Sequence, residues 1–337
     1  MPLTRSATFS SAPAHWYETC VGSVAMSYSR GSVLCLSPGG FHRIAYLDWG
    51  CVANDHVVLC VHGLARNSRD FDFLAAELAR DCRVVCPDVV GRGDSEWLAD
   101  KSDYRFSTYL ADAAVLLARA TAPARPRFFG LFRRLRDAGA ESKRIDWVGT
   151  SMGGLIGMLL AAKPGSPIRR LVLNDVGPFI SWGSLYRLKG YVGGARSFES
   201  VAAAESWIRE VCAPFGRLTD KQWRHLARHS VYEAKKGDYR LRYDPGIGEA
   251  LRGHSDPELP LGPNFLAGID LWSTWAEVRC PVLVLRGADS DVLTRDTVAR
   301  MQAGKPDLQV VEFEGAGHAP ALMDRGQIAA VTRFLLS

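Results

Sequence analysis

The stretch IDWVGTSMGGLIGMLLAAK, residues 145–163, decides the fold of this chain. Residues 145–149 form a short apolar run, as expected for a strand inside a sheet. Residues 152–163 have the length and apolar character of a buried helix. Between them the G-x-S-x-G run at 149–153 supplies small residues that let the strand and the helix approach closely. This strand–turn–helix arrangement predicts that Ser151 sits in a sharp, strained turn as an exposed nucleophile.

Strand and helix patterns alternate along the rest of the chain. Further apolar runs predict strands at 43–50, 57–63, 82–88, 168–175, 281–287 and 308–315, and helical spacing appears at 71–80, 109–120, 296–303 and 327–336. Alternation of this kind predicts a mostly parallel sheet with helices on both faces. The alternation stops at 178–276, where the chain has helical patterns without intervening buried strands. We expect an all-helical cap there, over the carboxyl edge of the sheet.

The same patterns divide the chain into segments. Residues 1–30 are expected to form a poorly ordered leader, and residues 31–177 together with 277–337 to form the core domain. The segment 125–143, RPRFFGLFRRLRDAGAESK, interrupts the alternation as a basic insertion. Its arginines fit a solvated surface helix or loop. The alternative is a basic amphipathic patch that contacts a membrane surface or a partner.

Composition excludes several classes of protein. The 337 residues carry a formal net charge of +5 without a long basic run, which gives no support to nucleic-acid binding. The eight cysteines are scattered and contain no CxxC pair, so neither a zinc site nor any other metal is expected. Several lie in apolar runs, as free thiols of a cytoplasmic protein do. No run approaches the 18 apolar residues that a membrane-spanning helix needs.

A serine nucleophile needs a general base, because its hydroxyl is a poor nucleophile at neutral pH. His318 follows the last predicted strand, in EGAGHAP, and precedes the last helix. A loop at that point reaches the same sheet edge as Ser151, so His318 is the expected base.

The base needs a carboxylate that fixes its tautomer. The loop after the strand at 281–287 contains Asp289 and Asp291, and its offset from the strand favours Asp291. Asp289 fits a local role within the turn. Asp175, at the end of LVLND, is a third candidate, for which we expect a structural or cap-anchoring role.

The oxyanion formed during catalysis needs backbone donors near Ser151. Met152 supplies one, since its N–H begins a helix, and Leu64, in the loop after the strand at 57–61, is the expected second donor. Gly63 lets the backbone approach the substrate, and His62 is expected to anchor the loop by hydrogen bonds. Arg66 either orients a substrate carboxylate or carbonyl, or pairs with an acid at the pocket mouth.

Six motifs in order carry a resemblance to a known family. HGLARNSRDF (62–71), PDVVGRGDS (87–95), GTSMGG (149–154), LVLNDVGP (171–178), LRGADSDVL (285–293) and GAGHAP (315–320) together resemble the α/β-hydrolase superfamily, and its capped esterase- and lipase-like branch in particular. The resemblance covers residues 40–337. It implies an eight-stranded, mostly parallel sheet with a helical cap between strands 6 and 7. It also implies that Ser151, Asp291 and His318 are the triad.

The resemblance and the residues together imply an acyl-transfer enzyme. Epoxide hydrolases and haloalkane dehalogenases carry aspartate where this chain has Ser151, so the expected function is hydrolysis of a carboxylic ester on a small to medium apolar substrate, with no cofactor. The same triad serves carbon–carbon bond hydrolases and thioesterases. A hydrolase-fold protein that binds a ligand without catalysis is the alternative of another class.

Overall fold

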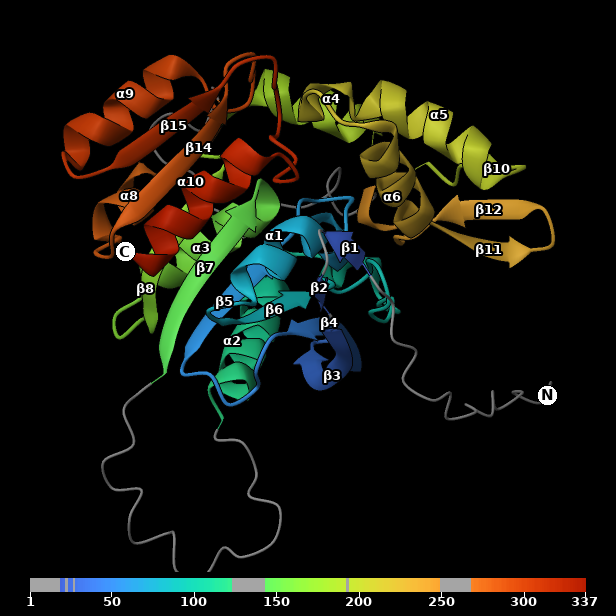
Figure 1. The fold of residues 1–337 in the computed structure, drawn as a ribbon, viewed down its shortest axis with the longest axis horizontal. Coiled ribbons are helices and arrows are strands. Elements are labelled where there is room, and N and C mark those ends of the chain that lie inside the picture. The colour runs from blue at the N-terminus through green and yellow to red at the C-terminus, as the bar shows by residue number, and fades with distance from the viewer. Residues whose placement is uncertain (1–18, 22–23, 27, 123–142, 192–193, 249–267) are drawn as a thin grey trace, which may run out of the picture.

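The computed structural model describes residues 19–337 apart from 22–23, 27, 123–142, 192–193 and 249–267. Its centre is an eight-stranded sheet in the order β15-β14-β8-β7-β5-β6-β4-β3 (Figure 1). The strands are β3 (Tyr28–Ser37), β4 (Gly40–Trp49), β5 (His56–Val61), β6 (Arg83–Pro87), β7 (Arg144–Thr150), β8 (Ile168–Asn174), β14 (Val282–Gly287) and β15 (Gln309–Phe313).

Most neighbouring strands of the sheet run parallel. The pairs from β15 to β6 are all parallel, whereas β4 pairs antiparallel with both β6 and β3 at one edge. The fold expected from the sequence is therefore confirmed, including the number of strands.

Alternate residues of the central strands face two separate apolar clusters. Val57 and Leu59 of β5 join the cluster on one side of the sheet, and Val58 and Cys60 join the cluster on the other. The first cluster includes α2 (Phe106–Thr121) and α3 (Met152–Ala161), and the second includes α1 (Asp72–Leu78) and α10 (Arg325–Leu336). Each buried aliphatic side chain stabilises this arrangement by about 1.5–3 kcal/mol. Burial on both faces explains why these strands are unbroken apolar runs.

The remaining helices of the core connect or flank these elements. They are η1 (Ser68–Phe71), η2 (Lys101–Asp103) and α9 (Arg295–Gly304), while α8 (Trp272–Glu277) ends the inserted segment and packs against α3.

The insertion between β8 and β14, the sixth and seventh strands of the sheet, forms the cap, which lies along one end of the sheet (Figure 1). Its elements are β9 (Phe179–Ser181), α4 (Trp182–Tyr191), β10 (Ser197–Phe198), α5 (Val201–Val211), η4 (Ala213–Phe215), α6 (Asp220–Ser230), β11 (Val231–Lys235), β12 (Asp238–Leu241) and β13 (Gly268–Asp270). The expectation of an all-helical insertion is wrong, because β10, β12 and β11 form a three-stranded sheet and β9 pairs with β13.

Local chemistry explains the β-hairpin that the helical pattern concealed. Helix α6 begins at a capping box formed by Thr219 and Gln222 and ends at Ser230, because Val231 has the extended angles φ −126° and ψ 160°. The chain then turns back at Gly237, whose φ of +76° suits glycine. The helical spacing of the sequence continues past Ser230, so periodicity alone does not show where α6 ends.

Two expectations fall partly or wholly on residues that the structure does not describe. The first 18 residues of the leader lie outside the described part, whereas Thr19–Val21 pairs with Val24–Met26 and the sheet begins at Tyr28 rather than at 31. The basic insertion lies outside the described residues up to residue 142. Within the described ranges, no helix has the length and apolar character to cross a membrane.

Candidate active site

Ser151 lies in the sharp turn between β7 and α3. Its backbone has φ 51° and ψ −115°, a strained conformation for a residue with a side chain. The glycines around it are required by close packing. A Cβ on Gly149 would lie 2.3 Å from the carbonyl oxygen of Gly153, and a Cβ on Gly153 would lie 2.0 Å from that of Val61. The glycines of the G-x-S-x-G run thus hold the elbow against the sheet.

His318 is hydrogen-bonded to this serine. Its Nε2 lies 2.9 Å from Oγ of Ser151, and its ring is largely buried. The loop that carries it follows β15 and is fixed to the cap, because the N–H of Gly317 donates to the carbonyl of Pro214 in η4 at 2.7 Å. An Nε2 that accepts the serine O–H is placed to take its proton.

Asp175 supplies the carboxylate on the other side of the imidazole. Its Oδ2 accepts from Nδ1 of His318 at 2.8 Å and from Oγ of Ser290 at 2.5 Å, while Oδ1 accepts from the N–H of Gly287 at 2.8 Å. The carboxylate is fully buried. Three donors therefore hold a buried anion, and this anion fixes His318 with Nδ1 protonated and Nε2 free to accept.

The position expected for Asp291 differs from what the structure shows. Asp291 is exposed and forms an ion pair with Arg187 of α4 at 2.5 Å, and Asp289 is also exposed. Asp175 instead makes the contact with His318 because β8 and β14 are neighbours in the sheet, so both strand ends reach the histidine loop. The carboxylate assignment is corrected from Asp291 to Asp175, which the sequence offered only as the third candidate.

The loop expected to hold the oxyanion follows β5 and lies against Ser151. A Cβ placed on Gly63 would be 3.8 Å from Cβ of Ser151, so the loop passes beside the serine. Met152 is the first residue of α3, where a backbone N–H has no acceptor within the helix.

A buried arginine that the sequence reading missed touches both expected oxyanion residues. Nε of Arg92 donates to the carbonyl of Leu64 at 2.9 Å, and its Nη2 lies 3.7 Å from the sulfur of Met152. Its side chain is fully buried, and Nη1 donates to the carbonyl of Val90 at 2.6 Å. The sequence gives only its place in the Gly-rich turn VVGRGDS after a buried strand, which does not show that the side chain is buried.

His62 is buried within this loop. The N–H of Val89 donates to its Nε2 at 2.9 Å, so Nδ1 carries the proton and donates to the carbonyl of Gly63 at 2.7 Å. Burial lowers the pKa of His62 to about 4. The ring is therefore neutral and structural at neutral pH.

Comparison with known proteins agrees with this geometry. The model of the alpha/beta hydrolase family matches residues 58–331. A 3-hydroxybutyrate-oligomer hydrolase of Cupriavidus necator is 40% identical over 308 residues, which is 90% of this chain and 96% of that protein. The chain belongs to the alpha/beta hydrolase family.

Other members of the family are also similar along most of their length. The crystal structure of an alpha/beta hydrolase from Novosphingobium aromaticivorans has a TM-score of 0.74 and 34% identity, covering 92% of this chain and 98% of that one. A 2-(acetamidomethylene)succinate hydrolase of Mesorhizobium japonicum is 26% identical, over 83% of this chain and 87% of that protein. The expected class of enzyme, a carboxylic ester hydrolase, is confirmed.

In this alpha/beta hydrolase Arg66 joins the core to the cap. Its Nε and Nη2 donate to the carboxylate of Asp70 at 2.8 and 2.6 Å, and its Nη1 donates to Oγ of Ser230 at 3.0 Å. The guanidinium also lies over the ring of Phe215 in η4, 5.7 Å from the centroid. Of the two roles expected for Arg66, these contacts agree with pairing to an acid, which is Asp70.

The aromatic residues of the cap differ in their surroundings. Trp182 and Tyr186 are exposed, at 43% and 80%, and the side chain of Tyr191 lies outside the described part. Phe198 packs against Trp207 with ring centroids 5.5 Å apart. This contact lies within the cap itself.

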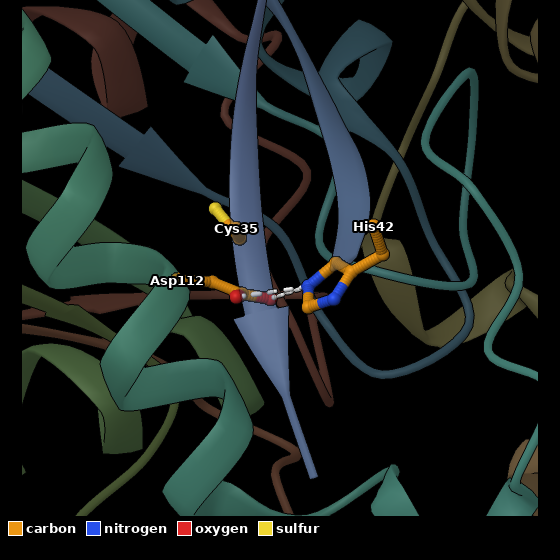
Figure 2. Close-up of side chains that lie close together, drawn as sticks. All are labelled: Cys35, His42 and Asp112. Carbon is orange, nitrogen blue, oxygen red and sulfur yellow. Dashed lines mark hydrogen bonds and ion pairs between the residues drawn. The ribbon is translucent and has the colours of Figure 1, made fainter. Parts of the chain in front are cut away.

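A second cluster of chemically capable side chains lies away from the triad, under the β3–β4 hairpin. Cys35 and His42 are directly paired across the hairpin and Asp112 reaches them from α2 (Figure 2). Nε2 of His42 lies 2.9 and 3.0 Å from the two oxygens of Asp112. All three residues are buried, and their residue types could ligate a metal.

The contacts within this cluster fit a structural role. Burial and the neighbouring Asp112 raise the pKa of the Cys35 thiol to about 12, so the thiol is protonated. Nδ1 of His42 is buried without a hydrogen-bond partner among the described residues, whereas ligating histidines normally donate their second ring N–H. We therefore describe it as a buried histidine–aspartate pair that fastens the edge hairpin to α2.

Proposed function

We propose that this enzyme hydrolyses the ester bonds of short 3-hydroxybutyrate oligomers or closely similar hydroxyacyl esters. Support comes from the 40% identity to the 3-hydroxybutyrate-oligomer hydrolase over nearly the whole of both chains. The observation that carries the chemistry is the continuous hydrogen-bond chain from Ser151 through His318 to Asp175.

In the proposed mechanism, Oγ of Ser151 attacks the ester carbonyl while Nε2 of His318 takes its proton. The buried carboxylate of Asp175 stabilises the imidazolium. The proton then passes from His318 to the departing alkoxide, which leaves as the alcohol. Water attacks the acyl-enzyme with His318 again as base and releases the hydroxy acid.

The backbone N–H groups of Leu64 and Met152 are the proposed donors to the oxyanion. Two contacts support this role: Gly63 lies beside Ser151, and Arg92 holds the peptide that carries the Leu64 carbonyl. An oxyanion donor contributes about 3–4 kcal/mol to catalysis in other enzymes. We propose Arg92 as a positioning residue for both donors.

We propose that residues 178–276 act as a substrate-covering cap on a core of 31–177 and 277–337. Support comes from η4, which contacts both the His318 loop and Arg66. We also propose a cytoplasmic location, supported by the burial of free cysteines such as Cys60 and Cys86 in the core.

The test compares turnover of a 3-hydroxybutyrate trimer, p-nitrophenyl butyrate and an acyl thioester by the native enzyme and by Ser151→Ala. We expect hydrolysis of the trimer, labelling of Ser151 by a fluorophosphonate, and loss of both in the variant. Hydrolysis of the thioester alone would replace the proposal by a thioesterase. Absence of both turnover and labelling would reject a serine hydrolase.

A further inference from the structure

A cavity of about 730 Å³ lies between α6 of the cap and the core. Its core wall includes Asn67 and Asp72 from η1 and α1, and Asp88 and Asp94 from the turn after β6. Of the residues that the structure describes, those lining the cavity do not include Ser151, His318 or Asp175. Its volume is that of a small-molecule site.

One face of α6 lines this cavity with basic side chains. The residues that line the cavity from α6 are Lys221, Arg224, His225, Arg228 and His229. They follow the i, i+3, i+4, i+7, i+8 spacing of a single helix face. All five are cationic or imidazole side chains, and Arg224 and Arg228 lie at the solvent-exposed side of that face.

Two of the carboxylates on the opposite wall, Asp94 and Asp72, already have cationic partners. Asp94 pairs with Arg30 and, at 2.7 Å, with Arg242. Nε and Nη2 of Arg69 both donate to Oδ2 of Asp72, at 2.7 and 2.5 Å. These pairs leave little negative charge to balance α6.

Asp88 is the third acid of the wall and is satisfied by the backbone. Its oxygens accept the N–H groups of Ser68 at 2.7 Å and Asp94 at 2.8 Å. Burial raises its pKa to about 6, so part of its charge is lost near neutral pH.

Two arginines of α6 therefore have no counter-ion among the residues that the structure describes. In the described part of the chain, no carboxylate lies within ion-pair distance of Arg224 or Arg228. Burial and the surrounding Arg69, Arg228 and Arg242 lower the pKa of His229 to about 2, as expected where the local potential is positive.

We propose that this cavity is a second binding site, specific for a small anion whose carboxylate or phosphate oxygens are held by Arg224 and Arg228. Guanidinium groups recognise both kinds of anion through paired, charge-assisted hydrogen bonds. The imidazoles of His225 and His229, which are less exposed than the two arginines, line the same cavity. The shared chemistry is an oxyanion of low molecular mass, from either a hydroxy acid or a phosphate.

A divalent metal is the competing occupant of the same wall. Ligand atoms of Asp72, His225 and His229 lie within 4.8 Å of one another, and Oδ1 of Asp72 has no hydrogen-bond partner among the described residues. A metal ion would, however, have to enter beside Arg69, which already holds the other oxygen of Asp72. The positive wall therefore favours an anion over a cation.

The site is joined to the oxyanion loop by two hydrogen bonds at the end of α6. Nδ2 of Asn67 donates to the carbonyl of His229 at 2.9 Å, and Arg66 donates to Oγ of Ser230. Both donors follow Leu64 closely in sequence. The loop that contains Leu64, Arg66 and Asn67 is thus hydrogen-bonded to the end of α6. We therefore expect an anion bound on α6 to stabilise the junction of cap and core.

The experiment measures binding by isothermal titration calorimetry at physiological ionic strength. Inorganic phosphate and 3-hydroxybutyrate are the two probes, and the enzyme is first blocked at Ser151 by a fluorophosphonate to occupy the catalytic site. The variant R224Q/R228Q removes the two arginines. The control R119Q/K236Q removes the same charge from exposed positions on α2 and on the turn between β11 and β12.

We expect saturable binding of at least one probe by the blocked enzyme, weakened about tenfold or more in R224Q/R228Q and unchanged in the control. Which probe binds identifies the source of the oxyanion. The proposal is overturned if neither probe saturates, or if both variants bind alike. Saturable binding of Zn²⁺ that is lost in His229→Ala, without anion binding, would establish the metal site instead. None of these readouts depends on turnover.

Discussion

Oδ2 of Asp175 lies 2.8 Å from Nδ1 of His318, across 143 residues of sequence. Asp291, 27 residues before the histidine, is turned outward and pairs with Arg187. The carboxylate that contacts the imidazole therefore comes from the end of β8, the sixth sheet strand, and the histidine from the loop after β15, the eighth.

This geometry predicts opposite results for two matched substitutions. Asp175→Asn should lower kcat on p-nitrophenyl butyrate by about 10⁴, because the amide removes the charge that fixes the imidazole. Asp291→Asn should keep nearly full activity, since it removes only an exposed ion pair. Circular dichroism checks that both variants are folded. A large loss in Asp291→Asn with little loss in Asp175→Asn would restore the assignment expected from sequence.

The elbow glycines give a second matched pair. Gly153→Ala places a Cβ 2.0 Å from the backbone oxygen of Val61, so we expect destabilisation by about 1–3 kcal/mol or more. Gly183→Ala, in α4, has no atom closer than 3.8 Å, and should be neutral or stabilise the helix by up to about 1 kcal/mol. Urea midpoints measure both effects. Equal midpoints for the two variants would show that the elbow tolerates a side chain.

The buried pair under the edge hairpin should be important for stability. Asp112→Ala leaves the ring of His42 buried without its hydrogen-bond partner, and we expect a loss of about 1–3 kcal/mol in the free energy of unfolding. Glu277→Ala, which removes an exposed pair with Arg279, should change it by less than about 1 kcal/mol. Denaturant titration distinguishes them, and a silent Asp112→Ala would contradict the structural role.

The stability of the enzyme should fall in mild acid because of His62. Its pKa of about 4 in the fold lies below the ordinary 6.5, so the unfolded chain takes up the proton first as pH falls. Stability present above about pH 6.5 is then lost toward pH 4, by up to about 3 kcal/mol. His229, with its pKa of about 2, acts in the same direction, whereas the raised pKa of Asp88 opposes them.

Urea midpoints at pH 7, 5.5 and 4.5 measure this slope. The variant His62→Gln should flatten it, because glutamine does not titrate. The same slope in native enzyme and variant would assign the acid sensitivity to other groups.

Sequence patterns predicted that Ser151 and His318 reach the same edge of the sheet, because each prediction depends on local structure. The glycines around Ser151 mark a tight strand-to-helix turn, and GAGHAP follows a strand. The choice among the three aspartates depends instead on which strand ends are adjacent. Since β8 and β14 are neighbours, Asp175 and Asp291 start from the same sheet edge, and only side-chain direction separates them.

The cap shows the limit of periodicity. The boundary between α6 and β11 is a change of backbone angle at Val231, within a segment whose spacing fits a helix. Arg92 was missed for a different reason: an isolated arginine in a Gly-rich turn reads as a surface residue, and its burial is a property of the assembled fold.

The three-residue turn η4 has a consequence for exchanging parts between relatives. The carbonyl of Pro214 accepts from the N–H of Gly317 in the His318 loop, and Phe215 packs on Arg66, so one short segment of the cap touches both the His318 loop and the proposed oxyanion loop. A chimera that transplants a foreign cap to change the preferred substrate must therefore carry a compatible turn at 213–215. Without a compatible turn, we expect the hybrid to lose turnover even if the new cap binds the intended substrate.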